Sequence, residues 1–485
     1  MKDRREHFRI RACRRIYHRD EGKFSFNISY ETHTELTDRA LIVAESFGLG
    51  VDEAQKFKVL DAELKIAPND VVYVTGDSGS GKSVLLRAIR QDLGDEAIDL
   101  SEVHIEADKP LIETVGATVE EGLELLSKVG LNDAFLFLRT YNQLSDGQKY
   151  RYRIAKLMES GKQWWLMDEF AATLDRDTAK IVAFNLQKIA RQQGKAVIAA
   201  TTHGDLFEDV NPSVHVHKRF GEEITINYYE NKPAEECSLT REMLIEEGAL
   251  SDWRRLSEFH YRSHHAGASR KVYCLRRGVE LCGVIVFTYP PPGCAGRHLV
   301  LPGKHSMKEL NLDLSTISRV VIHPKYRSIG LGAKLIRETL PRVGTPCIEI
   351  IAVMAKYNPF AEKAGMKKVL EQKPSEEALR IAGVLSSLGF DLRLLGSQKH
   401  VSDRLQSLSP ELLEALKESF VKNDHPRFRR EFAANRHMPY GTAKAYGEGV
   451  RNASMERMAR LVKITGMLLQ TKVYLFWQAT RLKSK

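Results

Sequence analysis

The segment after residues 71–75 constrains this chain more than any other feature. Residues 71–75 read as a buried strand, and they run directly into G-x-x-x-x-G-K-S and a helical pattern. Glycines at these positions let backbone N–H groups close around phosphate oxygens at a helix N-terminus. We therefore predict a nucleoside triphosphate site formed by the following residues: Gly76, Asp77, Ser78, Gly79, Ser80, Gly81, Lys82 and Ser83.

Two further pieces of chemistry belong to this site. Lys82 is expected to reach the β- and γ-phosphates, and Ser83 to bind Mg²⁺. A second apolar run, residues 164–167, ends in Asp168 and Glu169, and Asp168 lies 86 residues beyond Lys82. Asp168 is predicted to hold Mg²⁺ through water. Glu169 is predicted to polarise the attacking water as the catalytic acid–base group.

A third motif, Leu144-Ser145-Asp146-Gly147-Gln148, lies between the first two. Here the chain resembles the ABC ATPase superfamily, whose signature is L-S-G-G-Q, and only Asp146 departs from it. The resemblance implies that 173–175 is the D-loop and that His203 contacts the γ-phosphate. It also implies that the nucleotide is contacted by these signature residues: Ser145, Gly147 and Gln148.

The same resemblance sets expectations for assembly and location. ABC sites are composite, and one loop and one signature per chain predict a homodimer with ATP between its halves. Only 62 residues separate Lys82 from Leu144, and no run of eighteen apolar residues exists, so transport and a membrane partner are not expected. Six scattered cysteines and a start without an apolar leader favour the cytoplasm. The family's Q-loop glutamine is replaced by Glu106 or Asp108, between which the sequence does not choose.

A second glycine turn follows the apolar residues 318–322. It reads R-x-x-G-x-G and leads into an amphipathic helix. This resembles motif A of the GNAT acyltransferases, in which turn amides bind the pyrophosphate of acetyl-CoA. The resemblance implies a cofactor site made by the following residues: Ile322, Arg327, Ser328, Gly330, Leu331, Gly332 and Ala333.

The acyl-transfer residues are less constrained by pattern. Glu349 lies on the next expected strand and is a candidate general base, with His260, His264 and His305 as alternatives. GNAT members often carry a tyrosine that protonates the departing thiolate. Tyr357 is the candidate for that role, and solvent is the alternative.

These patterns predict an α/β chain with three parts. An ABC-type ATPase domain with a basic N-terminal lead-in is expected at 1–235, an α+β GNAT-like domain at 236–372, and a basic helical extension at 373–485. Residues 421–485 contain fourteen Lys or Arg and four Asp or Glu, which equals the net charge of +10 of the whole chain. This basic region predicts an RNA or DNA partner, with a solubilising surface as the alternative.

The leading hypothesis joins these parts. An acyl thioester already carries the energy for transfer, so ATP is expected to rearrange a macromolecular acceptor. We predict ATP hydrolysis coupled to acetyl-CoA-dependent N-acyl transfer onto a nucleic acid, with Phe428, Tyr440 and Tyr446 placed to stack on bases. The alternatives are a nucleic-acid clamp or repair-type ATPase whose second domain only binds or scaffolds, and acetylation of a protein or small amine.

Overall fold

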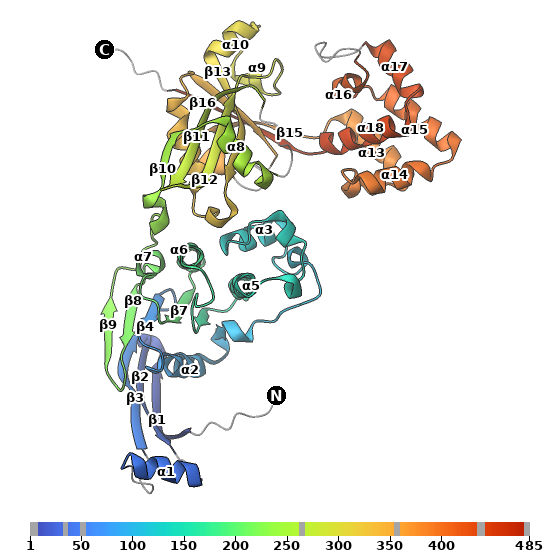
Figure 1. The fold of residues 1–485 in the computed structure, drawn as a ribbon. Coiled ribbons are helices and arrows are strands. Elements are labelled where there is room, and N and C mark those ends of the chain that lie inside the picture. The colour runs from blue at the N-terminus through green and yellow to red at the C-terminus, as the bar shows by residue number, and fades with distance from the viewer. Residues whose placement is uncertain are drawn as a thin grey trace, which may run out of the picture. The chain divides into compact units, whose positions relative to one another are not determined.

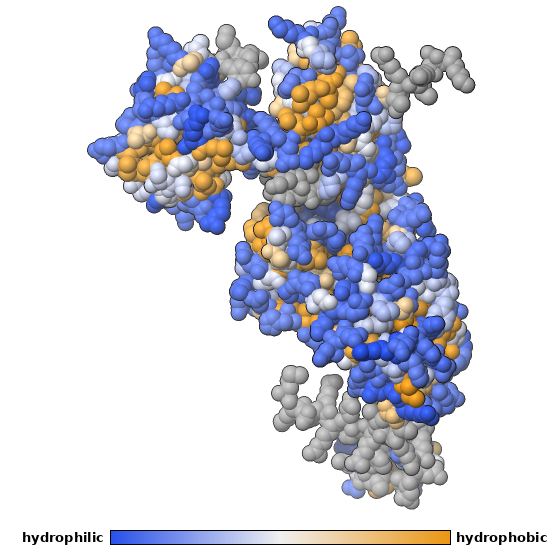
Figure 2. All heavy atoms as spheres, turned by 180° about the vertical axis from the view of Figure 1, so that it is seen from behind, coloured by the Kyte–Doolittle hydropathy of each residue, from blue (hydrophilic) through white to orange (hydrophobic). Residues whose placement is uncertain are grey.

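The computed structural model describes residues 8–32, 37–48, 55–260, 267–353, 359–433 and 442–479 (Figure 1). The chain divides into two compact units. The first unit comprises Met1–His264, Tyr273–Val284 and Val320–Leu335, and the second comprises His265–Val272, Ile285–Arg319 and Ile336–Lys485. None of the helices in the described ranges has the length and apolar character that a membrane span requires. Hydrophilic residues cover most of the face drawn in Figure 2, with hydrophobic residues in separate patches between them.

A six-stranded sheet lies at the centre of the first unit. Its order is β5-β6-β7-β4-β8-β9, and all neighbours are parallel except β8 and β9. Its strands are β4 (Val71–Thr75), β5 (Ala97–Asp99), β6 (Trp164–Met167), β7 (Ala196–Thr201), β8 (Val214–Lys218) and β9 (Ile224–Tyr228). This confirms the predicted α/β class for the N-terminal part.

Both faces of this sheet are buried, as a parallel sheet requires. Because side chains alternate along a strand, Val71 and Tyr73 enter one hydrophobic core while Val72 and Val74 enter the other. The first core also receives side chains from three helices: α3 (Val119–Lys128), α5 (Asp146–Glu159) and α6 (Arg176–Gln193). The second core receives side chains from α2 (Lys82–Leu93).

Residues before the first motif form structure of their own. The strands β1 (Phe8–His18), β2 (Lys23–Thr32) and β3 (Gln55–Lys65) make an antiparallel three-stranded sheet, and α1 (Asp38–Ser46) follows β2. Phe24, Phe26 and Ile28 alternate with polar residues along β2 and are buried in the second core. The basic N-terminal lead-in therefore includes folded strands, because alternating apolar side chains give this segment a buried face.

A seven-stranded sheet has the order β10-β11-β12-β13-β14-β16-β15. Its strands are β10 (Leu244–Glu247), β11 (Ser269–Arg277), β12 (Glu280–Thr288), β13 (Leu314–Ile322), β14 (Cys347–Ala352), β15 (Lys367–Gln372) and β16 (Lys472–Gln478). The accompanying helices are α8 (Leu250–Leu256), α9 (Arg297–Val300), α10 (Met307–Asp313), α11 (Leu331–Thr339) and α12 (Phe360–Lys363).

A helical bundle with its own core lies between β15 and β16 in sequence. Its helices are α13 (Glu376–Ser387), α14 (Gln398–Gln406), α15 (Pro410–Lys422), α16 (Pro426–Arg429), α17 (Ala443–Arg451) and α18 (Met455–Leu468). The helical extension predicted at 373–485 is wrong at its end. Val473–Phe476 are buried, and β16 pairs with both β14 and β15.

Candidate functional site

Three adjacent parallel strands end at the same edge of the six-stranded sheet. Thr75 of β4 is paired with Thr201 of β7, and Met167 of β6 is paired with Ala199 of β7. The loop after β4 carries the glycine segment, and the loop after β7 carries His203. Asp168 directly follows β6. Carboxyl ends of parallel strands are where open α/β sheets place ligands, so the topology brings together three motifs that are far apart in sequence.

The loop at 76–81 is shaped for close approach of another group to its backbone. Gly76, Gly79 and Gly81 have positive φ values of 146°, 78° and 100°. A Cβ on Gly76 would lie 1.9 Å from the carbonyl oxygen of Lys218, so only glycine fits there. The hydroxyl oxygen of Ser80 is buried and has no hydrogen-bond partner among the described residues. A phosphate oxygen fits this cradle, since the loop ends at the N-terminus of the twelve-residue helix α2.

Lys82 is buried at the start of α2. Its Nζ donates to the carbonyl oxygens of Gly76 at 2.8 Å and Asp77 at 2.6 Å. Burial lowers the pKa of Lys82, and the charges of Asp168 and Asp77 oppose that shift. Ser83 follows in the first turn of α2 and is half-buried. The residue pair predicted for Mg²⁺ thus lies at this edge of the sheet, with Ser83 in the first turn of α2 and Asp168 directly after β6.

The two acids differ in exposure. Asp168 is half-buried, and its Oδ1 accepts a hydrogen bond from the backbone N–H of Glu169 at 3.0 Å. Glu169 is exposed and has a left-handed backbone with φ of 51°, as does Ala171 with φ of 59°. Such backbone strain clusters at functional sites. The hydroxyl of Tyr150 on α5 accepts from the Ala171 N–H at 2.9 Å and supports this turn.

His203 is half-buried at the end of β7. The backbone N–H of His203 donates to the Thr201 hydroxyl at 3.2 Å, and its backbone carbonyl accepts from the Tyr73 hydroxyl. Two residues later, Asp205 forms an ion pair with Arg176, the first residue of α6. The sequence analysis missed this pair, although Arg176 directly follows the expected D-loop. The Arg176–Asp205 ion pair connects the start of α6, next to the expected D-loop, to the loop of His203.

The signature segment starts a helix. Ser145 caps α5: its hydroxyl accepts from the Gln148 N–H at 3.4 Å, while the Gln148 side chain accepts from the Ser145 N–H at 3.0 Å. A Cβ on Gly147 would lie 3.6 Å from the carbonyl oxygen of Thr173, so the signature lies beside the D-loop. Ser145 is exposed, which leaves this helix start accessible.

Neither candidate for the Q-loop position is distinguished by geometry. Glu106 forms an ion pair with Lys109 at 2.6 Å, whereas Asp108 accepts from the Asn142 side chain at 3.3 Å. Both follow β5, the neighbour of β6. The choice between them stays a prediction.

The turn predicted to bind acetyl-CoA is also exposed in part. Ser328 and Gly330 have φ values of 73° and 85°, and a Cβ on Gly330 would meet nothing within 4 Å. The Arg327 guanidinium donates to the carbonyl oxygens of Ile322 at 2.9 Å and Asn132 at 2.7 Å, which holds the turn in place. The remaining predicted residues, Leu331, Gly332 and Ala333, form the first turn of α11.

Glu349, the candidate base, is fully buried. Its carboxylate receives two hydrogen bonds from the Arg297 guanidinium, at 2.7 and 3.0 Å. The hydroxyls of Tyr474 and Thr316 donate to it at 3.0 and 2.8 Å. Glu349 therefore has no access to an acceptor in this arrangement, which argues against its predicted role as general base. Tyr357 and His264 lie outside the described residues.

The following known proteins each match about a third of this chain. Over 178 residues the chain is 32% identical to the cytochrome c biogenesis ATP-binding export protein CcmA of Gluconobacter oxydans, which covers 32% of this chain and 81% of that protein. It is 29% identical over 204 residues to the methionine import ATP-binding protein MetN of Xanthomonas oryzae pv. oryzae, covering 34% of this chain and 60% of that protein. It is 28% identical to the lipoprotein-releasing system ATP-binding protein LolD of Maricaulis maris over 195 residues, 32% of this chain and 84% of that protein.

No family model matches the chain. Among solved structures, a dimeric ATP-binding cassette in a post-hydrolysis state with ADP and Pi has 21% identity and a TM-score of 0.31, covering 36% of this chain and 93% of that one. The match to CcmA extends over 81% of the length of that protein. The chain therefore belongs, through the third of its length that CcmA matches, to the family of ATP-binding cassette ATPases.

Proposed function

We propose that this protein hydrolyses ATP with Mg²⁺ as a homodimer that holds nucleotide between its two ATPase domains. The support is that one chain carries one phosphate loop and one signature helix, and that the exposed Ser145 at the start of α5 is available to a second chain. Glu169 would activate water, and Ser83 and Asp168 would hold Mg²⁺.

We further propose that residues 236–372 transfer an acyl group from acetyl-CoA. The observation that carries this proposal is the short pairing of β13 with β14. The two strands run parallel and pair over Leu314–Thr316 and Cys347–Glu349, and the pairing ends there although both strands continue. Beyond the paired residues, the backbone N–H and C=O groups on the facing edges of β13 and β14 can bind an extended amide-containing arm. The glycine turn then offers N–H groups at the start of α11 for the pyrophosphate.

Calorimetry of the full chain with acetyl-CoA, in saturating Mg-ADP, tests this proposal. Gly330→Glu adds a negative charge where the pyrophosphate would lie, so it should abolish binding. Gly344→Glu is the matched control, because Gly344 has nearly the same φ, 88° against 85°, and equally open surroundings. Equal binding by wild type and Gly330→Glu would refute the site.

We propose a nucleic acid as the acyl acceptor because residues 421–485 carry an excess of ten positive charges. The base-stacking part of this idea is wrong for two of the three rings: Phe428 is fully buried and Tyr446 is 1% exposed. Tyr440 lies outside the described residues. Phosphate contacts remain as the proposed mode. If the chain binds nucleic acid and hydrolyses ATP without any acetyl-CoA turnover, the second domain acts as a scaffold instead.

A further inference from the structure

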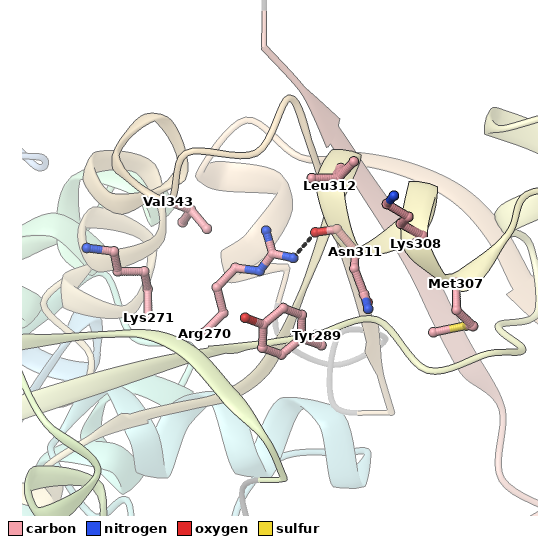
Figure 3. Close-up of a pocket in the computed structure, with 8 residues that line it drawn as sticks. All are labelled: Arg270, Lys271, Tyr289, Met307, Lys308, Asn311, Leu312 and Val343. Atoms are coloured by element: carbon pink, nitrogen blue, oxygen red, sulfur yellow. Dashed lines mark hydrogen bonds between the residues drawn. The ribbon is translucent and has the colours of Figure 1, made fainter.

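An open pocket of about 680 Å³ lies in the second unit (Figure 3). Arg270 and Lys271 come from the start of β11, Tyr289 follows β12, and Met307–Leu312 belong to α10. Its volume is within the range of roughly 300–1,000 Å³ typical of small-molecule sites. Neither the phosphate loop nor the turn at 327–333 lines it, so neither proposal above assigns it a ligand.

The centre of the pocket is the guanidinium of Arg270. It lies over the Tyr289 ring, with its Cζ 4.5 Å from the ring centroid, and donates through Nη2 to the carbonyl oxygen of Asn311. The Nε of Arg270 and the Oδ1 of Asn311 are buried and find no hydrogen-bond partner within the described ranges. Buried polar groups left without a partner are costly. The Arg270 Nε can donate to an anion, whereas the Asn311 Oδ1 needs an N–H or O–H donor, so a ligand that offers both gains affinity. Contact with the ring and the hydrogen bond to Asn311 restrain the guanidinium, which limits the directions of its N–H donors.

Charge makes the pocket selective for anions. Of the described residues that line it, Arg270, Lys271 and Lys308 are cationic and none is acidic. Figure 3 shows Lys271 on one side of the guanidinium and Lys308 on the other. A fork of N–H donors flanked by ammonium groups is suited to the several oxygens of a phosphate.

Three of the other side chains that line the pocket are large and accessible. Tyr289 is 48% exposed, Met307 41% and Leu312 66%. A phosphate alone would leave these side chains uncovered, whereas a ligand with a flat ring beside its phosphate would cover them. Aromatic side chains and arginine are the groups on which nucleobases stack.

We propose that this pocket binds a nucleoside phosphate, with the phosphate on Arg270 and Lys308 and the base against Tyr289 and Leu312. A free nucleotide and a terminal nucleotide of an RNA or DNA strand offer the same chemistry. The site does not depend on acyl transfer, so failure to bind acetyl-CoA leaves this proposal intact.

Calorimetry of the full chain with uridine 5′-monophosphate tests the site, with Mg-ADP present at saturation to occupy the phosphate loop. We expect saturable binding, weakened about tenfold or more when uridine or inorganic phosphate replaces the nucleotide. Arg270→Lys keeps the charge but loses the fork, so binding should fall about tenfold. Lys308→Gln changes an exposed side chain and should weaken binding by a smaller factor. Lys399→Gln on α14 removes the same charge outside the pocket and should change nothing.

Two oligouridylates, one with a 5′-phosphate and one with a 5′-hydroxyl, identify the source. Tighter binding of the phosphorylated strand than of the mononucleotide assigns a strand end, and the reverse assigns a free nucleotide. The proposal is overturned if the mononucleotide shows no saturable binding, if inorganic phosphate binds as tightly, or if both pocket variants bind like the wild type.

Discussion

The ammonium group of Lys82 lies where a triphosphate would lie. This ammonium group donates to two loop carbonyls, those of Gly76 and Asp77, and burial lowers the pKa of Lys82. Phosphate oxygens carry charge and form stronger hydrogen bonds with an ammonium than carbonyls do. We therefore expect nucleotide to draw Lys82 away from the carbonyls, which leaves the loop amides to bind the remaining phosphate oxygens.

Glu169 is the residue whose replacement separates binding from hydrolysis. Glu169→Gln keeps the size of the side chain but cannot take a proton, so hydrolysis should fall about 10²–10⁴-fold while ATP still binds. The trapped nucleotide should then yield a stable dimer in light scattering with Mg-ATP. The double variant Glu169→Gln, Lys82→Ala should stay monomeric, because it lacks the phosphate contact. If Glu169→Gln alone is monomeric at saturating Mg-ATP, the composite site is wrong.

Residues of the ATPase site were predictable because their motifs are local. Three of the motifs follow strands that are neighbours in one parallel sheet, and the signature starts helix α5. Glu349 shows the opposite case. Its partners Arg297 and Tyr474 are 52 and 125 residues away in sequence, so no pattern around Glu349 indicates that the carboxylate is buried. Phe428 likewise sits among cations in sequence but packs against Phe420 in the bundle.

At the scale of elements, the start of α6 joins the ATPase to residues from the next part of the sequence. The Asp177 carboxylate accepts from Arg277 Nη1 at 2.8 Å and from Lys325 Nζ at 2.6 Å, all within the first unit. Burial would raise the pKa of Asp177, but the hydrogen bonds from Lys325 and Arg277 outweigh it and hold the pKa below its ordinary value. Because α6 begins directly after the D-loop, this cluster links the ATPase site to the segment that precedes the glycine turn at 327–333.

Asp177→Asn should therefore lower the free energy of unfolding of the first unit by about 1.5–3 kcal/mol in urea at neutral pH. The lowered pKa means that the wild-type contribution is complete at neutral pH and is lost as the pH falls below about 4, where the variant and wild type should converge. Asp391→Asn is the control. It removes an ion pair with the exposed Arg393, so its effect on the free energy of unfolding should be much smaller. A pH-independent difference between Asp177→Asn and wild type would show that the charge is not the cause.

The strand that carries Glu349 was predictable from sequence, but β16 and its partners were not. The apolar run at 473–477 has the length of a strand, yet it follows a long helical region and gives no sign of where it pairs. In the structure, β16 lies between β14 and β15. Non-local pairing of this kind depends on complementary edges that only the folded chain brings together.

For the whole molecule, this topology decides how the basic region can be tested. Truncation near residue 420 would remove β16 together with the positive charges, and with it an internal strand of the seven-stranded sheet. Loss of binding after such a truncation would report unfolding as readily as a lost interface. Substitutions of exposed lysines on the bundle avoid this problem, because they leave the cores of the bundle and the sheet in place.

The following lysines are exposed: Lys422, Lys444 and Lys463. Changing all three to Gln removes three of the fourteen cations of residues 421–485. If each contacts a phosphate, the slope of log K against log salt for duplex DNA should become less steep by about 2 to 3, since each contact contributes about 0.9.

The matched control changes Lys367, Lys373 and Lys399, which are also exposed but lie outside 421–485. The control removes the same charge, so a general electrostatic effect would change both slopes equally. Titrations of fluorescent RNA and duplex DNA across a salt series measure both. An unchanged slope in the first triple variant, or an equal change in the control, would remove the basic region as the nucleic-acid site.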